Sequence, residues 1–506
     1  MLTRRKLLTG AGLALSFAAL GRSRSARASG RWGEPIPDPR GVLDLPAGFS
    51  YVILEESGQT MSDGYRMPGR PDGMACFAGP SGTLILMRNH ENSVGAIAEG
   101  PYREGQSAPP EAYDPNGMGG VSRVVVDAQC FSRISSNMVL IGSSRNCAGG
   151  PSPWGWLSCE ETILISGEHR HGYVFVCPID ADSVRPPDRK LGYGRFFHEA
   201  AAVDPSTNVA YLSEDRPDGC LYRFVPDAIA EPFVGKLQAL AVVGQPGYST
   251  GLLEVGSVLD IEWIDIDEPD PDQDTLRAEA HGKGAAVILR GEGMWFHQPD
   301  GSDAGQVFFS ATIGGPIGKG QIFRLIDGPA PTLEVVYGSS DPEVLDMPDN
   351  ITVAPWGDLF VVEDGTGTNS IRWLDGAGEL HHFGRTGLSE LTGICFSPDG
   401  RAMFVNIQAA GLTLVVTGPF VDEGGGDTGE GTSSETGAST SGSGTGGDSS
   451  SSDEAGAATS SEASCGSASE ADASCACSSD AGVGSSALAL AAAGVVAAGL
   501  RRESGE

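Results

Sequence analysis

Short apolar runs that end in an acid, an amide or a threonine form the main pattern of this chain. Each run follows a turn made of small or polar residues. Six copies occur, at residues 81–91, 155–161, 208–215, 306–312, 357–364 and 400–406. The 3.6-residue periodicity of amphipathic helices is nearly absent. Repeated turn–strand units predict an all-β fold, and six of them predict a six-bladed β-propeller.

A propeller would bring the ends of these runs together. Equivalent strands of all blades end at the same end of the central channel. The residues expected to converge there are Glu91, Glu160, Glu161, Glu214, Asp215, Glu363, Asp364 and Asn406. Because so many carboxylates repel one another when ionised, they predict bound cations in the channel.

Residues 146–161 combine several unusual features. The segment reads Asn-Cys-Ala-Gly-Gly-Pro-Ser-Pro and continues through two tryptophans to Cys159, Glu160 and Glu161. Gly and Pro punctuate the first half, so we expect a loop there and a strand afterwards. Cys147 and the two glutamates offer metal ligands. The alternative is a loop capped by aromatic residues, with no metal.

Both ends of the chain carry targeting features. Thr3-Arg4-Arg5-Lys6 precedes an apolar stretch and Ala26-Arg27-Ala28, which predicts a twin-arginine export signal over residues 1–28. We therefore expect a location in the periplasm or at the cell surface. A plain secretory signal is the alternative, and it would export the chain as well.

The propeller is expected over residues 29–420, followed by a low-complexity tail. Residues 421–480 are rich in Gly, Ser, Thr and acids, which predicts a disordered linker. The uncharged run over 481–500 precedes Arg501 and Arg502, so residues 481–506 are a weak membrane segment or sorting signal that would attach the chain to the cell envelope. A disordered Ala-rich tail is the alternative.

Charge limits the choice of partners. The formal net charge is −33; residues 1–29 carry six bases and residues 421–500 carry twelve acids, which leaves −27 for the core. A core this acidic repels nucleic acid and anionic membranes. Either bound cations or a salt-adapted surface would explain it. We expect a monomer that binds no nucleic acid.

The core also has seven cysteines, so at least one thiol stays outside any internal disulfide. Cys147 is the candidate, because it stands in a Gly-rich segment near carboxylates.

Several motifs together resemble those of the PhoX-type alkaline phosphatases. The matching stretches are residues 88–91, 146–150 with 159–161, 194–205 with 214–215, 290–293, 348–350 with 363–365, and 389–393 with 396–400. They span most of residues 35–420. Two departures stand out: the core is compact, and Phe197 occupies a position where a small polar residue is commoner.

The resemblance implies hydrolysis of phosphate monoesters at a centre of iron and calcium. It places an iron ligand on Cys147. The ligand and substrate shell that it implies consists of Glu91, Glu161, His198, Glu199, Glu214, Glu292, Asp349, Asn350, Glu363 and Glu390. Within that shell we assign His198 a catalytic role and the others metal binding.

No other hydrolase signature competes with this reading. The chain has no Gly-x-Ser-x-Gly elbow, Cys-x5-Arg loop, Walker loop or His-Glu-x-x-His pair. Arg88 or Arg195 could clamp a phosphate through two hydrogen bonds, although either could instead pair with structural acids. Without a protein nucleophile, catalysis would rest on the metals.

Two other functions stay open. Pro348-Asp349-Asn350 with Glu363-Asp364 also resembles calcium-binding propellers that open lactones, so a calcium-dependent lactonase or esterase is one alternative. That reading leaves Cys147 unexplained. The other alternative is a non-catalytic propeller displayed at the surface for binding.

Overall fold

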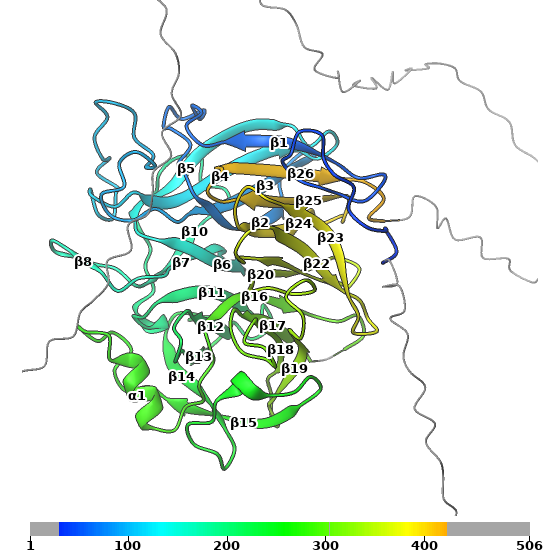
Figure 1. Ribbon diagram of the computed structural model, residues 1–506. Coiled ribbons are helices and arrows are strands. Elements are labelled where there is room, and N and C mark those ends of the chain that lie inside the picture. The colour runs from blue at the N-terminus through cyan, green and yellow to red at the C-terminus, as the bar shows by residue number, and fades with distance from the viewer. Residues whose placement is uncertain (1–29, 303, 422–506) are drawn as a thin grey trace, which may run out of the picture. The chain divides into compact units, whose positions relative to one another are not determined.

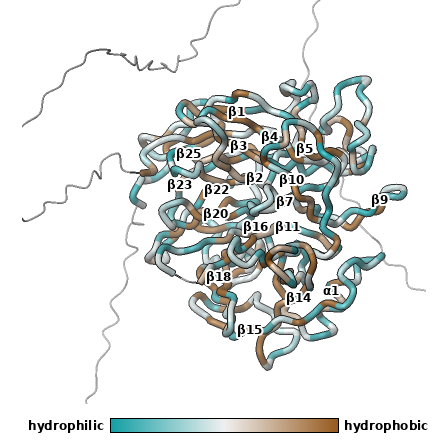
Figure 2. The backbone as a smooth tube through the Cα atoms, turned by 180° about the vertical axis from the view of Figure 1, so that it is seen from behind, coloured by the Kyte–Doolittle hydropathy of each residue, from teal (hydrophilic) through white to brown (hydrophobic). Residues whose placement is uncertain are grey.

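The structure is a computed structural model, and it describes residues 30–302 and 304–421. These residues form 26 strands, two short 3-10 turns and one α-helix, α1 (Leu276–Gly282) (Figure 1). Hydrophobic stretches run along the strands and hydrophilic segments along many of the turns (Figure 2). The prediction of an all-β propeller is confirmed. The predicted signal (1–28), most of the linker (421–480) and the apolar tail (481–506) lie outside the described residues.

Antiparallel sheets follow one another along the chain. The first consists of β2 (Pro71–Ala78), β3 (Thr83–His90), β4 (Gly119–Asp127) and β5 (Arg133–Ser143). The second consists of β6 (Asn146–Ser152), β7 (Gly155–Glu160) and β10 (Val174–Cys177), with a separate hairpin of β8 (Ile165–Ser166) and β9 (His169–Arg170).

The middle of the chain forms one nine-stranded sheet, in which β15 pairs with both β14 and β19. Its first half contains β11 (His198–Val203), β12 (Ala210–Glu214), β13 (Leu221–Pro226), β14 (Gly235–Val242) and β15 (Val258–Asp265). Its second half contains β16 (Gly291–His297), β17 (Gln306–Ala311), β18 (Gln321–Ile326) and β19 (Thr332–Gly338).

Two further sheets complete the ring. One consists of β20 (Pro348–Val353), β21 (Leu359–Glu363), β22 (Asn369–Leu374) and β23 (Leu380–Thr386). The other consists of β24 (Leu391–Phe396), β25 (Ala402–Ile407), β26 (Leu412–Thr417) and β1 (Ser50–Glu56). Because β1 pairs with β26, the two ends of the described chain share a sheet and close the ring.

Six inner strands define the repeat: β2, β6, β11, β16, β20 and β24. Six apolar layers separate the neighbouring units that these strands begin. The six apolar runs of the sequence coincide with β3, β7, β12, β17, β21 and β25, the second strand of each unit. The predicted six-fold repeat of apolar runs is thus present, and an inner strand precedes each run along the chain.

The loop expected at the start of residues 146–161 is instead the inner strand β6. Inner strands need small residues because neighbouring backbones nearly touch around the axis. A Cβ atom on Gly73 would lie 2.5 Å from the Ala148 Cα atom, and one on Gly293 would lie 2.6 Å from the Asn350 Cα atom. Tertiary packing therefore overrides the low strand propensity of glycine here.

Candidate metal and phosphate site

A β-bulge interrupts every inner strand at the same place. In each of the six, two residues near the start of the strand have no partner in the pairing with the second strand. A bulge turns a side chain away from its regular direction. The first bulged residues are Asp72, Cys147, Glu199, Glu292, Asp349 and Gly393. Five of the six equivalent positions therefore carry a metal-ligand type of side chain.

The second strands add another set of acids just beyond their ends. Glu91 follows β3, Glu161 follows β7, Asp215 follows β12 and Asp364 follows β21. Both sets line one cavity of about 180 Å³. Its lining residues are Arg70, Asp72, Glu91, Arg145, Cys147, Glu161, Glu199, Asp215, Arg290, Glu292, Asp349, Asp364, Glu390 and Gln408.

Two groups in this cavity have the spacing of a metal-binding site. Ligand atoms of Cys147, Glu161 and Glu199 all lie within 4.8 Å of one another, and so do those of Glu199, Glu292 and Asp349. Glu199 belongs to both groups and is 1% exposed, and its Oε1 atom has no hydrogen-bond partner. A buried carboxylate oxygen without a partner fits a metal ligand.

Burial and mutual repulsion disfavour the ionised acids. Burial raises the pKa of Asp72 and of Glu161 to about 8, and that of Glu390 to about 9. The pKa values of Glu199, Glu292 and Asp349 rise well above their usual range, first through burial and then through nearby carboxylates. Burial also raises the pKa of the Cys147 thiol. Bound cations would reverse these shifts, because they stabilise carboxylates and thiolates.

Three arginines share the cavity with the acids. Arg70, Arg145 and Arg290 each stand directly before an inner strand and have left-handed backbone conformations, with φ of 44°, 51° and 54°. Non-glycine residues held in this conformation cluster at functional sites. The Arg290 guanidinium donates to both carboxylate oxygens of Asp215, at 2.8 and 2.9 Å, and to Glu292 at 3.0 Å.

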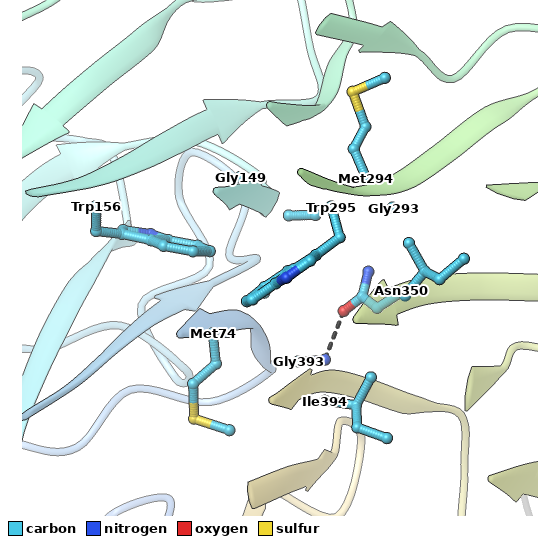
Figure 3. Close-up of a pocket in the computed structure, with 12 residues that line it drawn as sticks. Met74, Gly149, Trp156, Gly293, Met294, Trp295, Asn350, Gly393 and Ile394 are labelled. Carbon is cyan, nitrogen blue, oxygen red and sulfur yellow. Dashed lines mark hydrogen bonds between the residues drawn. The ribbon is translucent and has the colours of Figure 1, made fainter. Parts of the chain in front are cut away.

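The channel beneath the cavity is narrow and largely apolar. Figure 3 shows the Trp295 side chain extending from β16 into this pocket, toward Met74 of β2. Trp295 contacts three of the six apolar layers. Asn350 lies at the same level and accepts a hydrogen bond from the Gly393 backbone N–H. This floor restricts access to the cavity from below.

The structure brings together seven of the ten residues that the sequence assigned to metal binding. Those that line the cavity are Glu91, Cys147, Glu161, Glu199, Glu292, Asp349 and Glu390. Asn350 lies just below them, and its amide donates to Asp349 at 3.0 Å.

Glu214 and Glu363 do not line the cavity. Both are buried inside their sheets, where Glu214 accepts a hydrogen bond from Arg277 at 2.8 Å and Glu363 from Arg372 at 3.1 Å. Successive side chains of a strand point to opposite sides. The next residues, Asp215 and Asp364, therefore face the cavity instead.

The same alternation separates Glu160 from Glu161. Glu160 accepts hydrogen bonds from His171 Nδ1 and from the backbone of Gly172, at 2.6 and 2.8 Å, whereas Glu161 lines the cavity. Asn406 also points away from the cavity, donating to the Asp72 carbonyl at 2.7 Å.

His198 lies inside its blade and not among the cavity residues. Its ring stacks on Phe196, and its Nε2 atom lies 3.0 Å from the Gly194 carbonyl. Burial lowers its pKa to about 3, so the ring is neutral. Side chains alternate along this strand as well: Glu199 points into the cavity and His198 points away from it.

Arg88 and Arg195 have structural contacts and do not reach the cavity. Arg88 is buried and donates to Glu55 of β1 at 2.7 Å and to Thr413 of β26, which ties the first sheet to the last. Arg195 donates to the backbone carbonyls of His171 and Ile163. The arginines that line the cavity are instead Arg70, Arg145 and Arg290.

Asp215 and Asp364, which the sequence placed at the channel end without assigning them as ligands, line the cavity. Five further cavity residues were not expected at the site from the sequence: Arg70, Asp72, Arg145, Arg290 and Gln408. One feature of the sequence could have identified Asp72. Pro71-Asp72 and Pro348-Asp349 are the same dipeptide at the start of two inner strands, so the assignment of Asp349 could have led to Asp72.

A family comparison agrees with this geometry. The alkaline phosphatase PhoX family matches residues 30–139 and 131–411. The chain therefore belongs to this family, which supports a phosphatase function. No curated protein sequence matches the chain.

A solved structure supports the fold. The chain is similar to Pseudomonas fluorescens PhoX in complex with vanadate, described as a transition state analogue, with a TM-score of 0.60, 19% identity, and coverage of 76% of this chain and 97% of that one. A putative gluconolactonase gives a TM-score of 0.36 at 11% identity, covering 76% and 97%. A gluconolactonase from Xanthomonas campestris gives 0.34 at 14%, covering 74% and 99%. The last two similarities are too weak to bear on function.

Proposed function

We propose that this chain is an exported, metal-dependent phosphomonoesterase of the alkaline phosphatase type, with iron and calcium in the channel cavity. The observation that carries the proposal is the ring of bulged residues, which aims four carboxylates and one thiol at the same space, next to three arginines.

Charge balance supports bound cations. Nine carboxylates and three arginines line the cavity, so the ionised acids greatly outnumber the positive side chains. Carboxylates suit calcium, while the Cys147 thiolate adds a soft ligand suited to iron. When bound, these cations would polarise a phosphoryl group and neutralise its charge.

The protein groups would bind and orient the ester. The guanidinium groups of Arg70, Arg145 and Arg290 match the geometry of phosphate oxygens. Trp295 would limit water from the lower side of the channel. No part of this scheme needs a protein nucleophile.

Elemental analysis and three substrates test the proposal. Purified protein should contain iron and calcium and should hydrolyse an aryl phosphate at neutral to alkaline pH, with inhibition by free phosphate. Calcium alone, together with lactone hydrolysis and no phosphate release, would support the lactonase. No hydrolysis of phosphate, lactone or carboxyl ester would support the binding propeller.

Arg290→Lys tests the phosphate-binding role. Lysine keeps the charge but loses the bidentate geometry, so the inhibition constant for free phosphate should rise about tenfold. Arg324→Lys is the matched control, because Arg324 pairs with Glu334 in a separate groove. Equal phosphate inhibition of the Arg290 variant and the wild type would remove Arg290 from the proposed site.

Export is the remaining part of the proposal, and it is supported by the Arg4-Arg5 pair in the first 28 residues. Cell fractionation should place active protein in the periplasm or at the cell surface. Substitution of both arginines by lysine should leave it in the cytoplasm, whereas unchanged export would contradict the twin-arginine route.

A further inference from the structure

The residue two positions before the first bulged residue of an inner strand lines the cavity in three of the six units. In three units it is an arginine: Arg70 precedes Asp72, Arg145 precedes Cys147 and Arg290 precedes Glu292. All three arginines line the cavity. In the unit that begins with β11, the corresponding residue is Phe197, two positions before Glu199.

The backbone of Phe197 lies between two cavity acids. It forms an antiparallel bridge with Glu161, and its carbonyl accepts a hydrogen bond from the Asp215 backbone N–H at 3.3 Å. Phe197 itself is not part of the cavity lining, but the two residues that its backbone contacts are.

The Phe197 side chain points away from the interior of its blade. Its neighbours Phe196 and His198 are fully buried and stack on each other, with ring centroids 3.6 Å apart. The His198 backbone N–H donates to the Phe196 carbonyl at 2.9 Å, so Phe197 is the middle residue of a tight turn and its side chain projects away from this stacked pair. The backbone contacts with Glu161 and Asp215 place this turn beside the cavity lining.

One cation already contacts this ring. The Arg216 guanidinium lies 4.4 Å from the centroid of the Phe197 ring. Both residues are half-buried, so part of each side chain is accessible. A planar aromatic group can stack on such a surface while the nearby positive charge favours an anionic molecule.

We propose that Phe197, backed by Arg216, is a specificity determinant for phosphomonoesters whose alcohol part carries a planar aromatic ring. The proposal rests on the phosphomonoesterase function and adds a substrate class to it. The phosphate would occupy the cavity, and the ring of the leaving group would lie on Phe197 at the rim.

Two esters separate ring stacking from leaving-group reactivity. Benzyl phosphate and cyclohexylmethyl phosphate have similar alcohols and sizes, but only the first has a planar ring. Phe197→Ala should lower kcat/KM for benzyl phosphate about five- to tenfold, as expected for one lost aromatic contact, and change the cyclohexylmethyl ester less than twofold. Phe197→Tyr should keep the wild-type preference.

Phe77→Ala is the matched control. Phe77 is also half-buried and belongs to an inner strand, but it stands near the end of β2 away from the cavity. This variant should leave the ratio between the two esters unchanged. Equal losses for both esters in Phe197→Ala, or no loss for either, would overturn the proposal.

A binding measurement tests the role of Phe197 separately from the proposed phosphomonoesterase activity. Calorimetry with benzylphosphonate and cyclohexylmethylphosphonate should show tighter binding of the aromatic compound to wild-type protein and a lost difference in Phe197→Ala. If no ester is hydrolysed but this difference is present, the phosphatase proposal fails and the aromatic platform stands. If both esters are hydrolysed without a ring preference, the platform alone fails.

Discussion

Glu199→Gln should abolish phosphatase activity and at the same time stabilise the metal-depleted protein. Glu199 belongs to both candidate metal groups, so an amide there weakens two sets of ligands at once. We expect an activity loss on the order of 100-fold or more, as for other losses of metal-site contacts. Steady-state assays and elemental analysis of the same samples would measure it.

The expected gain in stability of the metal-depleted variant has an electrostatic cause. Burial, followed by repulsion from Glu292 and Asp349, raises the pKa of Glu199. Without cations, the ionised carboxylate destabilises the folded state, and a neutral amide removes that cost. At pH 8 the free energy of unfolding of the metal-depleted variant should exceed that of the metal-depleted wild type by about 1–3 kcal/mol.

The pH dependence follows from the same shifts. A carboxyl group whose pKa is raised by folding destabilises the protein as pH rises from its ordinary pKa toward the raised one. The stability of metal-depleted wild type should therefore fall between about pH 5 and pH 8, since the pKa values of Asp72 and Glu161 rise to about 8. The fall should be smaller in Glu199→Gln.

Glu334→Gln is the control for these measurements. Glu334 pairs with Arg324 in a separate groove, so its loss should alter neither metal content nor the slope of stability against pH. A Glu199→Gln protein that retains its metals and its activity would contradict the assignment of Glu199 as a shared ligand.

The architecture could be predicted because the second strands carry a strong hydrophobic pattern. Runs such as residues 306–312 and 357–364 are apolar enough to identify, and their six-fold repetition indicates a propeller. The inner strands carry no such signal. Crowding around the axis selects glycine and alanine at positions such as Gly73 and Ala148, so β6 looks like a loop in the sequence.

The motifs that form the site could be predicted from the sequence, but the side of the strand to which each side chain points could not. Glu214-Asp215 and Glu363-Asp364 are pairs of adjacent acids, and a shift of one residue decides which member faces the cavity. The bulges add a second uncertainty, because the regular strand pairing is interrupted at residues such as Glu199. Arg88 and Arg195 illustrate a third uncertainty: a buried arginine within a matching motif can hold the scaffold together and lie outside the site.

Cys147→Ser should lose iron while keeping the fold. Cys147 is a free thiol at the bulge of β6, next to Glu161 and Glu199. Burial and four neighbouring carboxylates raise its pKa, and a bound cation would oppose that shift. Serine has almost the same shape, but its hydroxyl is a harder and far less acidic donor. Iron content should fall at least about tenfold and activity about 100-fold.

Calcium and stability distinguish a lost ligand from a damaged fold. Calcium should fall less than iron in Cys147→Ser, because the carboxylates are intact. The thermal midpoint of the metal-depleted variant should match that of metal-depleted wild type, since the Cys147 side chain belongs to none of the apolar layers. Cys130→Ser, which alters an exposed thiol, is the control and should change nothing. Full iron content in Cys147→Ser, or a disulfide at Cys147 in the purified protein, would show that the thiol is not the soft ligand and that carboxylates alone hold the metals.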